Sequence, residues 1–113
     1  MAENRRVVVT GLGVVSPVGS TLDSFWAAIL AGESGVGPIT YFDTAAFDTK
    51  FAGQVKGCNV EDFVPKKEAR RMDPFCHYGV AAAKMAGADS GVDMSQGDAA
   101  PGGVIPGSGG GGL

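Results

Sequence analysis

Apolar residues recur at helical spacing between Thr21 and Ala31, and this is the clearest pattern in the chain. Spacing of i, i+3, i+4, i+7 and i+8 places side chains on one face of a helix. Ser20 or Thr21 can cap its first amides, and Gly32 can close it in a left-handed turn. The pattern therefore predicts an amphipathic helix over Thr21–Ala31. Its apolar face consists of Leu22, Phe25, Trp26, Ile29 and Leu30.

Short runs of β-branched and aromatic residues predict strands on either side of this helix. The valines of Arg5–Thr10 indicate a strand that is buried on both faces. Phe51–Val55 indicates a second strand, and Val104–Ile105 a poor last one, because glycine and proline flank it. The stretch Gly11–Ser20 is predicted to be loop, and Glu33–Lys50 to be irregular.

Two further helices are predicted in the second half of the chain. Pro65–Met72 suggests a brief basic helix. Asp73 and Pro74 then supply an N-cap and a proline at the first helical position, where a missing N–H has no cost. Gly87 is expected to weaken the end of this helix by about 1 kcal/mol relative to alanine. Strands that alternate with helices predict an α/β layered fold with a mostly parallel sheet. One side of the last helix carries Phe75, Tyr78, Ala82, Met85 and Ala86.

Composition and length narrow the class of protein. The chain has 113 residues, 44% hydrophobic and 19% charged, so residues 1–113 are expected to form one domain or part of one. No apolar run approaches the ~20 residues that a membrane span needs, and the first residues lack the apolar core of a secretory signal. Two cysteines without a secretory signal indicate reduced thiols. We therefore expect a cytoplasmic protein that does not bind membranes.

The basic residues are unevenly placed. The net charge is −3, which argues against nucleic acid, yet four of the nine Lys and Arg residues fall between Lys66 and Arg71. On a helix Lys67, Arg70 and Arg71 share a face, at spacings of i, i+3 and i+4. This cluster predicts either a docking site for an acidic partner or a solvated helix face.

The first glycine loop has two interpretations. A strand followed by Gly11-x-Gly13 is one feature of dinucleotide-binding loops, where glycines let the backbone approach a pyrophosphate at the start of a helix. Here Pro17 and Gly19 separate the strand from the helix, and Ser16 stands where a third glycine is expected. A tight turn at the end of a buried strand is the second interpretation.

The chain also resembles a known family along nearly its whole length. The motifs that carry the resemblance are Val7-Val8-Val9-Thr10-Gly11-Leu12-Gly13-Val14-Val15-Ser16-Pro17-Val18-Gly19, Phe25-Trp26, Leu30-Ala31-Gly32-Glu33-Ser34-Gly35, Phe42-Asp43, Phe51-Ala52-Gly53-x-Val55-Lys56, Lys67-Glu68-x-Arg70-Arg71-Met72-Asp73, Tyr78, Ala81-Ala82 and Gly107-Ser108-Gly109-x-Gly111-Gly112-Leu113. In this order they resemble the opening of the β-ketoacyl-acyl carrier protein synthases, most of all the elongating type of bacterial fatty acid synthesis.

The resemblance implies a fold and a reaction. The fold is thiolase-like: two similar halves form a five-layered α/β/α/β/α sandwich, and two subunits form a homodimer. In the reaction, a cysteine thiolate takes the acyl group from a carrier protein. Two histidines promote decarboxylation of the malonyl thioester, and the resulting carbanion attacks the acyl thioester. The resemblance implies no cofactor and no metal.

The resemblance assigns roles to few residues of this chain. The catalytic cysteine and histidines of the family follow the second glycine loop, so no catalytic residue is expected within residues 1–113, and the segment alone is expected to be inactive. Cys58 has no partner suggested by sequence, while Cys76 and His77 are adjacent on a helix and point about 100° apart.

Two features remain as candidate sites. Lys67, Arg70 and Arg71 are expected to bind the acidic, phosphopantetheine-bearing acyl carrier protein. The resemblance implies that Gly110 takes the place of a residue that is often bulky and apolar, and so leaves a deeper acyl pocket. The alternative is that glycine serves only the backbone geometry of this glycine-rich stretch. The alternatives are a stand-alone module that binds the carrier protein, and a nucleotide-binding α/β domain.

Overall fold

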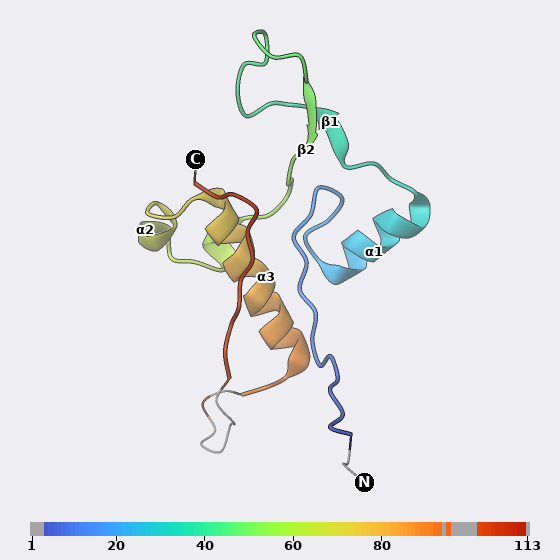
Figure 1. Ribbon diagram of the computed structural model, residues 1–113, viewed down its shortest axis with the longest axis vertical. Helices are drawn as coiled ribbons and strands as arrows, with labels where there is room; N and C mark the ends of the chain where they lie inside the picture. The colour runs from blue at the N-terminus through green and yellow to red at the C-terminus, as the bar shows by residue number, and fades with distance from the viewer. Residues whose placement is uncertain (1–3, 94, 96–101, 113) are drawn as a thin grey trace.

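The computed structural model describes residues 4–93, 95 and 102–112, and its longest helix lies at the centre (Figure 1). Helix α3 is flanked by α1 on one side and by α2 with a short 3₁₀ helix, η1, on the other. Strands β1 and β2 form an arm, residues 36–53, that projects beyond the helices. In chain order the elements are α1 (Leu22–Ala31), β1 (Val36–Pro38), β2 (Phe51–Gly53), η1 (Val60–Asp62), α2 (Lys66–Ala69) and α3 (Pro74–Ser90).

Helix α1 confirms the strongest pattern of the sequence to within one residue. Thr21 is the N-cap: its Oγ1 accepts from the Ser24 N–H at 3.2 Å, and the Thr21 N–H donates to Ser24 Oγ at 3.2 Å. This reciprocal pair is a capping box, with serine in the role usual for glutamate. Gly32 ends the helix in the left-handed region at φ 70°.

Helix α3 begins where the sequence predicts and runs past Gly87. Pro74 occupies the first turn, although the side chain of Asp73 makes no capping hydrogen bond. The helix ends at Ser90, and Gly91 adopts the left-handed conformation at φ 65°. A single internal glycine costs only about 1 kcal/mol, which a 17-residue helix tolerates.

The sheet among the described residues is a two-stranded antiparallel pair within the arm. Val36 pairs with Gly53 and Pro38 with Phe51, and Ile39 extends the contact by donating to the Lys50 carbonyl at 3.0 Å. The strand predicted at Phe51–Val55 is thus confirmed over its first three residues. Its partner, β1, lies within Glu33–Lys50, which was predicted to be irregular. That prediction was wrong for β1, because the backbone pairing there does not depend on an alternating side-chain pattern.

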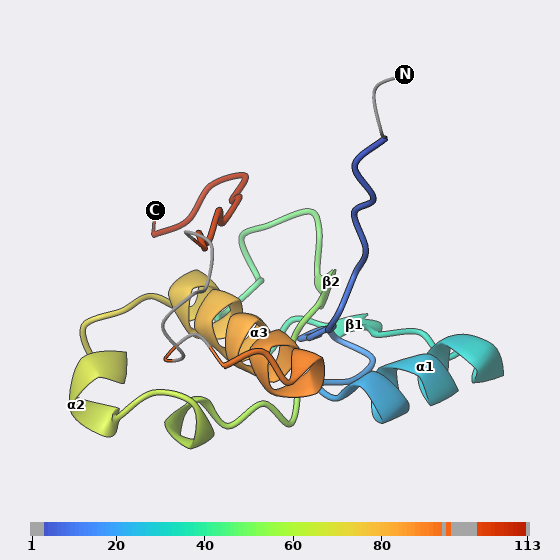
Figure 2. The same cartoon turned by 90° about the horizontal axis from the view of Figure 1, so that it is seen from below.

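The other two predicted strands do not form among the described residues. The stretch 5–10 and Val104–Ile105 are irregular, with Val7 86% and Ile105 98% exposed. A strand exists only where a neighbour supplies ladder hydrogen bonds, and no described segment pairs with either stretch. The mostly parallel sheet is therefore also absent from the part of the chain that the structure describes. Figure 2 shows both terminal segments on the same side of the molecule.

Close backbone contact, rather than strand pairing, attaches the first segment to α3. A Cβ added to Gly13 would lie 2.0 Å from the carbonyl oxygen of Ala82, and one on Gly11 would lie 2.3 Å from that of Ala86. The Leu12 N–H donates to the Asp89 carboxylate at 2.9 Å. Gly11 and Gly13 thus let the chain lie directly against α3. Their nearest neighbours belong to the second half of α3, and not to a helix N-terminus as in a phosphate-binding loop.

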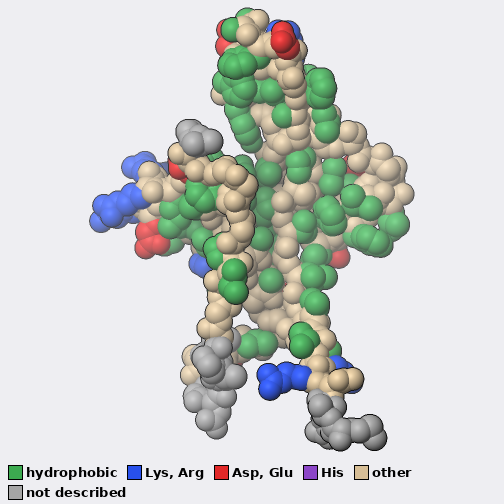
Figure 3. Space-filling model, viewed as in Figure 1, with side chains coloured by type: hydrophobic (Ala, Val, Ile, Leu, Met, Phe, Trp, Pro, Cys, Tyr) green, Lys and Arg blue, Asp and Glu red, His purple; other side chains and the backbone are tan. Residues whose placement is uncertain are grey.

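Very little of the apolar surface is covered. The accessible area is 9170 Å², whereas a compact monomer of 11.4 kDa exposes about 5,800 Å². The radius of gyration is 17.7 Å, against about 13 Å for a compact domain of this length. Apolar side chains are accordingly spread over the visible surface in Figure 3. Among the described residues the buried hydrophobic side chains are Ala28, Val64, Ala69 and Ala81.

Candidate functional site

Three cations predicted to form a site lie at one corner of the molecule, where α2 turns into α3. We call Lys67, Arg70 and Arg71 the basic turn; all three are exposed. The helix predicted over Pro65–Met72 is present as a single α-helical turn. It continues as a tight turn, because the Arg71 N–H donates to the Glu68 carbonyl at 2.9 Å. In Figure 3, Lys and Arg side chains gather over α2.

No described carboxylate forms an ion pair with the basic turn, although Glu68 lies between Lys67 and Arg70 in the sequence. Lys66, the neighbouring cation, lies 3.4 Å from the carboxylate of Glu61, and both side chains are largely exposed. No ion pair joins Lys67, Arg70 or Arg71 to any described residue. The structure therefore leaves three adjacent cations available to an acidic partner.

Helix α3 supports this corner through two side chains. The ring Nε2 of His77 lies 2.8 Å from the Ala69 carbonyl oxygen, and Nζ of Lys84 donates to the Phe63 carbonyl. Sequence reasoning missed both contacts. The signal that could have indicated them is the spacing of seven residues between His77 and Lys84, which places both on one face of α3.

The thiols and the histidine do not form a nucleophile–base pair. Burial, followed by the nearby Asp62 carboxylate, raises the pKa of Cys58, which is the reverse of what a reactive thiolate needs. The Nε2 of His77 faces the Ala69 carbonyl. Among the described residues there is also no group of three His, Cys, Asp or Glu side chains that could hold a metal ion.

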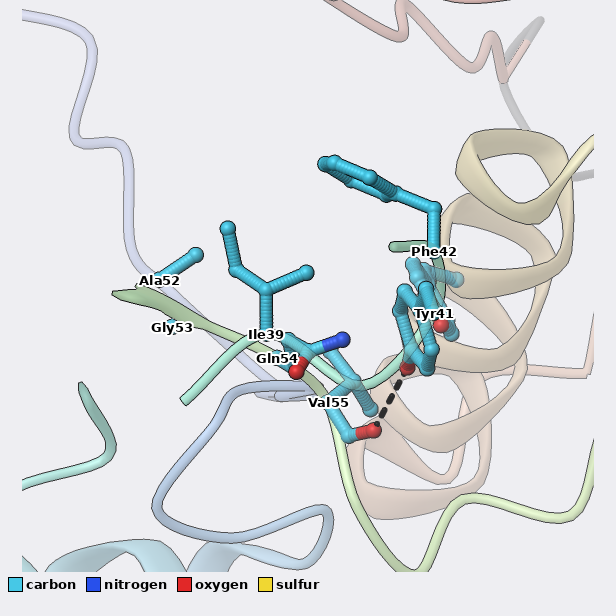
Figure 4. A pocket seen from close by; sticks show the side chains of 8 residues that line it. Ile39, Tyr41, Phe42, Ala52, Gly53, Gln54 and Val55 are labelled. Atoms are coloured by element: carbon cyan, nitrogen blue, oxygen red, sulfur yellow. Dashed lines mark hydrogen bonds between the residues drawn. The ribbon is translucent and has the colours of Figure 1, made fainter. Parts of the chain in front are cut away.

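One cavity, of about 260 Å³, lies between the arm and α3 (Figure 4). Gln54 is buried at its wall, where its Oε1 accepts from the Thr40 N–H at 2.9 Å and its Nε2 has no partner in the described structure. The Tyr41 hydroxyl donates to the Val55 carbonyl at 3.0 Å. Burial, then a hydrogen bond with Tyr41, raises the pKa of Tyr78. The remaining walls are apolar.

A second cavity, of about 440 Å³, separates α3 from the carboxyl-terminal segment. Phe75, Cys76 and Val80 line it from the helix, and Val104 and Pro106 from the segment.

Gly110 is exposed and is not among the residues that line this cavity, the last of which is Ser108. Its φ is not positive, so the backbone there does not require glycine. The next residue, Gly111, passes so close to Phe75 that an added Cβ would lie 2.6 Å from the ring.

No described helix is both long and apolar enough to span a membrane.

Comparisons with known proteins show the family to which this chain is similar. A profile described as the beta-ketoacyl synthase N-terminal domain matches residues 4–113. The chain is 54% identical over 109 residues to 3-oxoacyl-[acyl-carrier-protein] synthase 2 of Vibrio cholerae, covering 96% of this chain and 26% of that protein. It is 43% identical over 111 residues to the synthase of the same name from Synechocystis, covering 98% of this chain and 27% of the relative.

A solved structure agrees with these relatives. The ishigamide ketosynthase/chain length factor superposes with a TM-score of 0.72 at 38% identity, over 82% of this chain and 23% of that one. The α/β, thiolase-like fold class expected from the resemblance is thereby confirmed. The chain spans about a quarter of the length of the relatives it matches.

Proposed function

Because this chain belongs to the β-ketoacyl synthase family, we propose that it forms the amino-terminal part of a β-ketoacyl-acyl carrier protein synthase. Such an enzyme joins an acyl thioester to a malonyl thioester with loss of carbon dioxide, in fatty acid or polyketide synthesis. The sequence similarity over residues 4–113 supports this proposal. We assign no catalytic residue within the chain and no cofactor, and we expect the complete synthase to be a homodimer.

The contribution of this chain that its geometry supports best is recognition of the acyl carrier protein. The observation that carries the proposal is the basic turn, in which three exposed cations lie within five consecutive residues without an ion pair to a described residue. An acidic protein would be attracted to such a patch, chiefly through its rate of association and its orientation. The attraction should weaken with salt, because exposed charges are screened within about 8 Å at physiological ionic strength.

A second contribution is the depth of the acyl pocket. We propose that Gly110 leaves space for a long acyl chain in the complete synthase. The backbone supports this interpretation, since its φ does not demand glycine.

The test of the proposed function uses a chimeric synthase, in which this chain replaces the matched segment of the Vibrio cholerae relative. We expect the chimera to condense acyl and malonyl carrier proteins. An inactive chimera that is folded and dimeric would contradict the proposal. If the isolated chain nevertheless bound carrier protein, the stand-alone binding module would be the better interpretation.

The carrier site is tested separately by charge reversal. We expect Lys67→Glu/Arg70→Glu to slow association with acyl carrier protein about tenfold or more at low salt, and less at high salt. The matched control is Arg5→Glu/Arg6→Glu, which changes the net charge equally in the exposed amino-terminal segment. Equal effects of the two double variants would mean that only net charge matters and that the basic turn is no docking site.

A further inference from the structure

We infer that His77 and Lys84 are positioning residues that hold the basic turn in its binding geometry. The inference rests on the proposed carrier-docking function and names the part of the fold that makes it work. Neither side chain belongs to the basic turn, and both belong to α3. Their common target is the backbone of the segment that carries the cations.

The contact from His77 holds the end of α2. A carbonyl oxygen only accepts hydrogen bonds, so Nε2 of His77 carries the proton and donates to Ala69 at 2.8 Å. The same oxygen also accepts from the Met72 N–H at 3.1 Å. Both lone pairs of this carbonyl are therefore used, one by the turn itself and one by α3. Arg70 and Arg71 follow Ala69 directly, so the contact lies next to two of the three cations.

The contact from Lys84 holds the start of the same segment. Its Nζ donates to the carbonyl of Phe63, which caps the carboxyl end of η1. Cations are favourable at this end of a helix, because the last carbonyls point outward without a partner. Val64, the next residue, is 3% exposed and so anchors the backbone between the two contacts.

The segment needs such support because it has little structure of its own. An isolated helix as short as the four residues of α2 is unstable in water, since too few hydrogen bonds offset the ordering of its backbone. Held at Phe63 and Ala69, the segment presents Lys67, Arg70 and Arg71 at fixed spacing. A loose turn would have to be ordered at the moment of binding, which weakens association.

The test compares three variants in the chimeric synthase. His77→Leu keeps the bulk of the side chain but removes the donor, His77→Gln restores an Nε2 donor, and Lys84→Met keeps the stem without the charge. We expect His77→Leu and Lys84→Met to speed amide hydrogen exchange at Arg70–Met72 by roughly three- to tenfold, as loss of one hydrogen bond implies. The Kd for acyl carrier protein should rise about threefold or more, and His77→Gln should restore both values.

Two readouts separate positioning from general stability. The ¹⁵N shifts of the wild-type imidazole should report a protonated Nε2, and circular dichroism should show that the helix content of the variants is unchanged. Wild-type amides at Arg70–Met72 that exchange without protection would overturn the inference. So would unchanged exchange and affinity in both His77→Leu and Lys84→Met.

The outcome also distinguishes this inference from the docking proposal on which it rests. If Lys67→Glu/Arg70→Glu leaves carrier affinity unchanged, the docking site itself is wrong and the inference falls with it. If that charge reversal weakens binding while His77→Leu and Lys84→Met do not, the docking site stands and only the positioning role is wrong.

Discussion

Replacing Gly13 by alanine tests the contact that attaches the amino-terminal segment to α3. The new Cβ would lie 2.0 Å from the carbonyl oxygen of Ala82 and 2.8 Å from the nitrogen of Ala86, both of them helix backbone. Real Cβ atoms essentially never approach other heavy atoms within 3.0 Å, so segment and helix must separate by about 1 Å. Overpacking of this kind costs about 1–3 kcal/mol.

The separation also stretches a hydrogen bond, which adds to the loss. The Leu12 N–H donates to Asp89 at 2.9 Å, and an exposed bond of this kind contributes about 0.5–1 kcal/mol. We therefore expect Gly13→Ala to lower the free energy of unfolding by about 1.5–4 kcal/mol. With a urea slope of about 1–2 kcal/mol/M, the midpoint followed by circular dichroism should fall by about 1–4 M.

Gly87, which lies on α3 itself, provides the control. No atom lies within 4 Å of the Cβ that alanine would add there, so Gly87→Ala should instead stabilise the helix by about 1 kcal/mol. A Gly13→Ala midpoint equal to that of the wild type would refute the contact. A loss of equal size in both variants would show that an added methyl group destabilises the protein with or without a close neighbour, and the explanation from close approach would be wrong.

Three further predictions follow from the caps, the thiol and the proposed pocket. Thr21→Ala should lower the free energy of unfolding by about 1 kcal/mol in urea titrations, whereas Thr21→Ser, which keeps the hydroxyl, should not. The pKa of Cys58 is raised by burial and by Asp62, so less thiolate is present at pH 8, and iodoacetamide should alkylate Cys58 more slowly than in the unfolded chain. Asp62→Asn should speed the alkylation of Cys58. Equal rates in the variant and the wild type would contradict the role assigned to Asp62. In the chimeric synthase, Gly110→Ile should reduce kcat/KM for long acyl carrier substrates more than for short ones, and a uniform loss would argue against a pocket role.

Local signals in the sequence predicted the helices well. The ends of α1 are marked by Thr21 and Gly32, and the start of α3 by Pro74, because caps and first turns depend on a few neighbouring residues. The short helix that carries Lys67 was also predicted, although it ends at Ala69 and so does not include Arg70 and Arg71.

The sheets and the cavities were not predictable in the same way. A run such as Val7–Val9 predicts a strand only if a partner lies beside it, and pairing is a property of two segments. The antiparallel pair of the arm joins residues far apart in the chain through backbone groups, which the side-chain pattern does not report. The contact from His77 to Ala69 likewise depends on how α3 crosses the preceding turn. The roles of the basic turn and of Gly110 came from the family resemblance and stay predictions.

The uncovered apolar surface has a consequence for biosynthesis. The accessible area exceeds that of a compact monomer of this mass by about 3,400 Å². In a synthase of the relatives' length, about 300 residues are still to be translated when this segment leaves the ribosome. At about 5–20 residues per second that is an interval of roughly 15–60 s. In the proposed synthase, the valines of the amino-terminal segment lack the later-translated segments during this interval, so the nascent chain should rely on chaperones from its first quarter onward.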